Sequence, residues 1–125
     1  MATAAAALLI LAAASTAAPP TALQCPALPG QTLVYIDIYD GPPEKQADLA
    51  PDATMTPSYG KTSNIWKLEA GPDGLFVKCG YGKKLEGPYS QIETIQLPAT
   101  VTRCRADFKS GAGANELILQ KFVCR

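Results

Sequence analysis

The chain has 125 residues, a length that suits one domain, and its 11 Lys and Arg balance its 11 Asp and Glu to a formal net charge of zero. This balance argues against a general nucleic-acid binder, which needs excess Lys and Arg to displace counterions. The 47% of hydrophobic residues argues against disorder, and 11 prolines and 10 glycines divide the chain into the short segments typical of a β-rich fold.

The N-terminal segment is predicted to be a signal peptide. Residues 1–18 are almost all Ala and Leu and carry no charge, and small residues that suit a signal peptidase follow as far as Ala22. The apolar run is too short to span a bilayer as a helix. A buried Ala-rich helix is the alternative, but it would have no polar face. We therefore interpret residues 1–22 as the signal peptide and residues 23–125 as a single β-rich domain, periplasmic or secreted, with no membrane span after signal removal.

The first half of this domain begins with an extended arm over residues 23–32. Residues 33–39 alternate apolar and polar side chains, which predicts a half-buried strand. Residues 44–50 can form about two helical turns, favoured by the preceding prolines and stopped by Pro51. Residues 51–62 are then expected to form a loop, and residues 64–69 a short strand that holds Trp66, the only tryptophan.

The second half is predicted to be a meander of four strands, over residues 75–81, 90–97, 101–108 and 117–124. Side-chain alternation places Cys104 on one face with Ala106 and Phe108, and Cys124 on one face with Ile118 and Phe122.

The four cysteines are Cys25, Cys79, Cys104 and Cys124, and in an exported chain they indicate two disulfides. Three pairings are possible. In a simple meander the Cys104 and Cys124 strands are neighbours, whereas Cys79 and Cys104 would be separated by an intervening strand, beyond the roughly 7 Å Cα separation of a bridge. This favours Cys25–Cys79 with Cys104–Cys124.

The sequence contains only weak matches to catalytic and metal-binding motifs. The chain has no histidine, so neither a usual zinc site nor an activated catalytic thiol is expected. Ser58 and Lys61 match the S-x-x-K motif of penicillin-binding proteins, but they lie in a Pro- and Gly-flanked loop and lack the further motifs of those enzymes. The acidic residues between 37 and 52 lack calcium-loop spacing. We predict no catalytic residues, no metal, no cofactor and no enzyme activity.

Two features suggest binding. Residues 26–75 carry seven acids and three bases, whereas residues 76–125 carry eight bases and four acids, an asymmetry that would attract a charged partner if it persists in space. Lys83 and Lys84, expected on an exposed hairpin after Cys79, are the candidate partner contact. A binding face of tyrosines with Trp66 is also possible, although a lone Trp is more often part of the core.

Several landmarks occur in order: Cys25-Pro26, Asp40-Gly41-Pro42-Pro43-Glu44, Cys79-Gly80-Tyr81, Leu97-Pro98, Cys104 and Val123-Cys124-Arg125. The chain thereby resembles a family of small exported, disulfide-bonded proteins of Gram-negative bacteria with no assigned function. The resemblance implies export and a disulfide-bonded domain.

We therefore expect a mostly β fold, a small disulfide-stabilised antiparallel sheet or a sandwich- or barrel-like domain with one short helix. The expected function is a non-enzymatic binding or accessory role in the cell envelope, toward an unknown protein or envelope ligand and not a nucleic acid. The alternative is an inhibitor of a hydrolase such as lysozyme, because periplasmic lysozyme inhibitors are also small, exported and β-rich.

Overall fold

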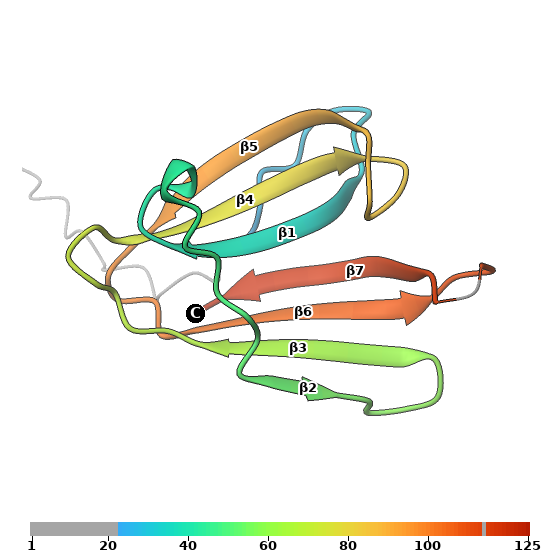
Figure 1. The fold of residues 1–125 in the computed structure, drawn as a ribbon. Helices are drawn as coiled ribbons and strands as arrows, with labels where there is room; N and C mark the ends of the chain where they lie inside the picture. Colours follow the sequence, from blue (N-terminus) through green and yellow to red (C-terminus); the bar gives the residue numbers. More distant parts are fainter. Residues whose placement is uncertain (1–22, 114) are drawn as a thin grey trace, which may run out of the picture.

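A computed structural model describes residues 23–113 and 115–125, so the predicted signal peptide lies outside the described residues. These residues form two antiparallel sheets, with strand orders β1-β4-β5 and β2-β3-β6-β7 (Figure 1). The strands are β1 (Leu33–Asp40), β2 (Ala53–Met55), β3 (Lys61–Lys67), β4 (Leu75–Gly82), β5 (Tyr89–Leu97), β6 (Arg103–Ser110) and β7 (Leu117–Cys124). The mostly β fold class is confirmed.

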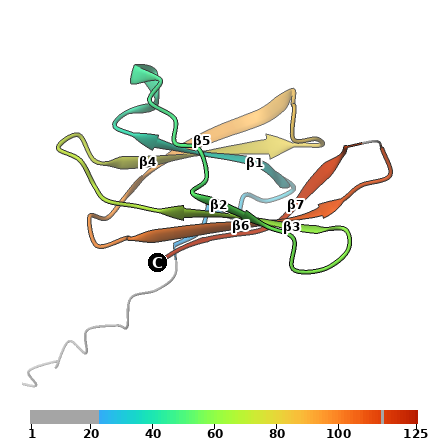
Figure 2. The same ribbon diagram turned by 60° about the horizontal axis from the view of Figure 1, so that its bottom comes forward.

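The sheets face each other as two layers (Figure 2), and β1 lies beside β7 at one edge (Figure 1). Alternation decides which side chains fill the space between them. Val34, Ile36 and Ile38 of β1 are all buried, and so are Leu75 and Val77 of β4. The opposing sheet contributes buried Trp66, Ala106, Phe108, Leu119 and Phe122 to the same core.

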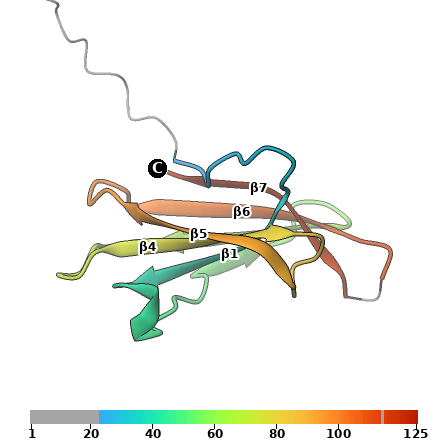
Figure 3. The same cartoon turned by 90° about the horizontal axis from the view of Figure 1, so that it is seen from above.

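The predicted four-strand meander is wrong in one respect. β4 pairs with β5 and β6 pairs with β7, but β5 does not pair with β6. After Leu97 the chain crosses to the other sheet through a link that begins with Pro98, and Figure 3 shows β5 and β6 in different layers. A proline cannot donate to a strand ladder, so this position suits a crossing between sheets.

Both disulfides follow the expected pairing. Cys104 and Cys124 are register partners on β6 and β7, with Cα atoms 4.0 Å apart. Cys25 joins the arm before β1 to Cys79 on β4, with Cα atoms 6.0 Å apart. Cys79 and Cys104 are kept apart not by an intervening strand, as the meander predicts, but because β4 and β6 belong to different sheets.

The expected helix over residues 44–50 does not form. A single 3-10 turn, Pro43–Lys45, ends at Gln46, which has a left-handed φ of 57°. The following residues extend along the edge of β1, where the Leu49 N–H donates to the Ile38 carbonyl at 2.8 Å. Pairing with that open strand edge therefore replaces the second helical turn. Part of the expected loop over residues 51–62 likewise forms β2, which pairs with β3.

The side-chain parity predicted for β7 is also wrong at one end. Asp107 pairs with Lys121 but Phe108 pairs with Leu119, so Gln120 is an extra residue in a bulge. The bulge reverses the alternation, which buries Leu119 and leaves Ile118 37% exposed. Within the described residues, no helix has the length and apolarity needed to cross a membrane.

Candidate functional site

The outer face of the β2-β3-β6-β7 sheet collects most of the positive charge of the chain. We call this surface the basic face and define it by Lys61, Lys67, Arg103, Arg105, Lys109, Lys121 and Arg125. All seven are exposed, and they are seven of the 11 basic residues in the sequence. Positive charge therefore gathers on one face, but not as the two halves of the sequence divide it: β3 adds Lys61 and Lys67 from the first half, whereas Lys78, Lys83 and Lys84 of the second half lie on β4 or on the link after it, in the other sheet.

Strand register produces this face. On β6, buried Cys104, Ala106 and Phe108 point into the core, so the residues between them point outward. Pairing then places like charges opposite each other, with Lys61 across from Lys109 and Lys67 across from Arg103. Directly opposed like charges are destabilising in a sheet.

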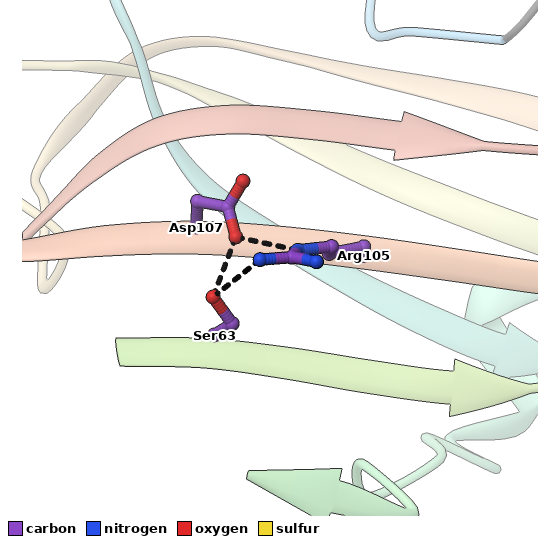
Figure 4. A network of polar contacts seen from close by, with 3 residues as sticks. All are labelled: Ser63, Arg105 and Asp107. Atoms are coloured by element: carbon purple, nitrogen blue, oxygen red, sulfur yellow. Dashed lines mark hydrogen bonds and ion pairs between the residues drawn. The ribbon is translucent and has the colours of Figure 1, made fainter. Parts of the chain in front are cut away.

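A polar network lies at the centre of the basic face (Figure 4). The Ser63 hydroxyl donates to Asp107 Oδ1 at 2.6 Å, and Arg105 Nε donates to the same oxygen at 2.8 Å. Arg105 Nη2 also donates to the Ser63 hydroxyl at 3.2 Å. Ser63 is 2% exposed, whereas the Arg105 side chain is 44% exposed. The buried hydroxyl and the carboxylate therefore orient a guanidinium that still has N–H groups to offer.

The same contacts set the ionisation of Asp107. Partial burial alone would raise the pKa of its carboxyl group. The hydrogen bonds from Ser63 and Arg105, together with the positive charges of Arg105 and Lys121, outweigh that effect and lower the pKa below its ordinary value. Asp107 is therefore a carboxylate at neutral pH.

A groove of about 420 Å³ runs over the centre of this face, lined by Arg103, Arg105, Asp107, Lys121, Val123 and Arg125. A second hollow of about 240 Å³ adjoins it and shares Arg105 and Asp107. Four bases and one acid line the larger groove, so its side chains carry a net charge of +3. Such a groove suits an anionic group, and its half-buried Val123 adds an apolar contact.

The residues singled out in the sequence lie elsewhere. Lys83 and Lys84 are exposed in the link between β4 and β5, on the other sheet, and their role as a partner contact stays a prediction. Ser58 lies in the turn before β3 and Lys61 is the first residue of that strand, where its N–H donates to the Ser58 carbonyl at 3.1 Å. This turn is not the helix start that an S-x-x-K nucleophile requires. No group of three or more potential metal ligands occurs among the described residues.

The aromatic candidates do not form one binding face. Trp66 and Tyr81 are buried at 4% and 1% exposure, which confirms the core interpretation of Trp66, whereas Tyr59 is fully exposed on the turn before β3. Tyr35 instead stacks on Tyr89, on the outer face of the three-stranded sheet, with ring centroids 5.2 Å apart.

The sequence analysis did not predict the network of Ser63, Arg105 and Asp107, although the alternation along one strand indicates two of its three members. The alternation that places Cys104, Ala106 and Phe108 in the core also places Arg105 and Asp107 outside it. Ser63 could not be added without the register between β3 and β6, which joins residues 44 positions apart.

The comparison with protein families gives one match. The model for type VI secretion system Tli immunity proteins matches residues 27–125. Comparison with curated proteins and with solved structures gives no match. The expected small, disulfide-bonded family is supported in these general terms, but the expectation that the family has no assigned function is wrong, because the matched family is described as one of immunity proteins.

Proposed function

We propose, from the premise that this chain belongs to the type VI secretion system Tli immunity protein family, that it binds and neutralises a toxic effector delivered by such a system. The observation that carries the proposal is the family match, which extends over residues 27–125 and so includes every strand of the fold. Of the two functions expected from the sequence, this proposal favours the inhibitor over the general accessory role. It does not favour lysozyme as the target.

The structure supports a binding mode of action. One disulfide joins β6 to β7 and the other ties the N-terminal arm to β4, and crosslinks that restrict a binding surface before association lower its entropic cost. The chain then acts by occupying a surface of the effector and turns over no substrate.

Export forms part of the proposal. We propose that residues 1–22 direct the chain to the periplasm and are removed there, and that the two disulfides form in that oxidising compartment. Intact-mass measurement of protein purified from the periplasm should give an N-terminus between Ala18 and Leu23.

The test is protection against a toxin. Each effector exported by the type VI system of the producing strain is directed to the periplasm of a susceptible host, with or without this chain. Survival with one effector, together with inhibition of that effector by the purified chain, is the expected result. The chain without residues 1–22 should not protect. If the chain neither protects against nor binds any of the effectors, the proposal is wrong. Lysozyme, assayed in parallel, should keep its activity.

A further inference from the structure

We infer that the basic face is the docking surface for the effector, and that it receives an acidic protein surface whose Asp or Glu side chains enter the groove beside Arg105. This inference rests on the proposed function and names the surface and the partner chemistry that the function requires.

Most of the positive charge of this face has no internal counterpart, because Asp107 is its one acidic member against seven basic residues. Among the described residues only two salt bridges form, Lys45–Asp73 and Arg105–Asp107, and only the second involves the basic face. Residues 1–22 and 114 contain no acidic residue, so they cannot supply one. Asp52 approaches the edge of the face, but its carboxylate accepts the main-chain N–H of Lys67 at 2.7 Å. The opposed charges of Lys61 and Lys109 therefore lack a neutralising side chain until a partner provides it.

Arg105 has the properties of an anchor residue for binding. Arginine is enriched among the residues that dominate binding energy, and its guanidinium can bind a carboxylate through two parallel hydrogen bonds. Here Ser63 and Asp107 fix its orientation before any partner arrives, as Figure 4 shows. A side chain that is already ordered loses less entropy on binding than a free one.

Asp107 restricts which anionic partner fits the groove. Asp107 lies within the groove, and its lowered pKa keeps it charged. A carboxylate at this position repels a dense run of phosphates, as in a nucleic acid or an anionic membrane. A protein surface can instead place a carboxylate beside Arg105 and a basic side chain beside Asp107. Exposed Ile118 and Met55, at 37% and 42% exposure on strands of the same sheet, add the apolar contacts that protein interfaces use.

The experiment measures the affinity of the full mature chain for the effector that it neutralises. Arg103→Glu combined with Lys121→Glu reverses two charges in the groove and keeps the three side chains of Ser63, Arg105 and Asp107 that form the network. Lys45→Glu combined with Lys78→Glu makes the same change in net charge away from the basic face, and is the matched control. Circular dichroism and thermal unfolding establish that both variants fold. Arg105→Ala tests the anchor separately.

We expect the Arg103 and Lys121 variant to lose at least 100-fold in affinity and the control to change by less than threefold. The affinity of the wild-type chain should fall steeply as salt rises, because screening weakens exposed charge pairs, and the groove variant should lose most of this dependence. Lys83→Glu combined with Lys84→Glu, which tests the contact expected from the sequence, should behave like the control.

Three outcomes would overturn the inference. If the groove variant folds and binds the effector as tightly as the wild type, the basic face is not the docking surface, although the immunity function stands. Binding of the wild type to vesicles of anionic phospholipid or to duplex DNA, at effector-like affinity and through Arg103 and Lys121, would assign the face to phosphate groups. If the wild type binds no effector at all, the immunity function and the inference both fail.

Discussion

Replacing Ser63 with Ala should lower the stability of the domain and also remove one of the contacts that orient the Arg105 guanidinium. The hydroxyl is buried at 2% exposure and joins a carboxylate to a guanidinium. A hydrogen bond to a charged group contributes about 1.5–3 kcal/mol to stability. Asp107 is one-third exposed, so water can replace part of that bond, and we expect a loss of about 1–2 kcal/mol. In a domain of this size each kcal/mol lowers the melting temperature by about 4–8 °C.

Urea unfolding of Ser63→Ala, Asp107→Asn and the double variant would measure how the three groups are coupled. Because both substitutions break the same contacts, the double variant should lose less stability than the sum of the single variants, by at least about 0.5 kcal/mol. Thr54→Val is the matched control. Its hydroxyl donates to Asn64 on the same sheet but is exposed, so the change should cost less than about 0.5 kcal/mol.

The pH dependence gives a second measurement on the same variants. The pKa of Asp107 is lower in the folded chain, so its contribution to stability is present above the ordinary value of 3.8 and is lost as the pH falls through the folded value. Without the Ser63 hydroxyl this pKa rises, and the stability difference between wild type and Ser63→Ala should shrink as the solution is acidified. Additive losses, or a stability difference that does not depend on pH, would refute the proposed coupling.

Three further predictions concern the rest of the fold. Thiol titration in denaturant without reductant should find no free thiol in native protein; loop closure predicts a stabilisation of about 4 kcal/mol for Cys25–Cys79, with 54 residues of separation, and about 3 kcal/mol for Cys104–Cys124, with 20. Trp66→Phe should cost about 1–3 kcal/mol in urea unfolding, because it removes the donor to the Leu49 carbonyl at 2.9 Å and leaves that acceptor without this bond. Burial raises the pKa of Tyr35, Tyr39, Tyr81 and Tyr89, with negative neighbours adding to the effect, so stability should fall as pH rises above about 10, and tyrosinate absorbance should track unfolding.

The parts of the fold that could be predicted are those set by local alternation. The strand at Leu33–Asp40, the core face of Cys104, Ala106 and Phe108, and the Cys104–Cys124 pairing all follow from a period of two. The failures have non-local causes. The edge of β1 recruits residues 47–49 that would otherwise continue a helix, and a bulge at Gln120 reverses the parity of β7.

The candidate site could be predicted only in part, because one of its three residues is brought in by pairing between strands that are distant in the sequence. Arg105 and Asp107 are two residues apart and share a face by alternation, so their contact was predictable from the sequence. Ser63 reaches them only because β3 pairs with β6 in one particular register, and a shift of that register by one residue would turn the Ser63 side chain to the other face of the sheet.

The same register bears on the proposal that the basic face docks the effector. Successive side chains of a strand point to opposite faces, so the residues that fill the core do not dictate the charge of the outward residues. Acidic residues opposite Lys61 or Lys67 would have gained cross-strand ion pairs, yet Lys109 and Arg103 occupy those positions. Stability alone favours the ion pairs. In the proposed complex an acidic effector surface would offset the cost of the like charges, and Lys109→Glu should therefore stabilise the free domain while weakening the complex.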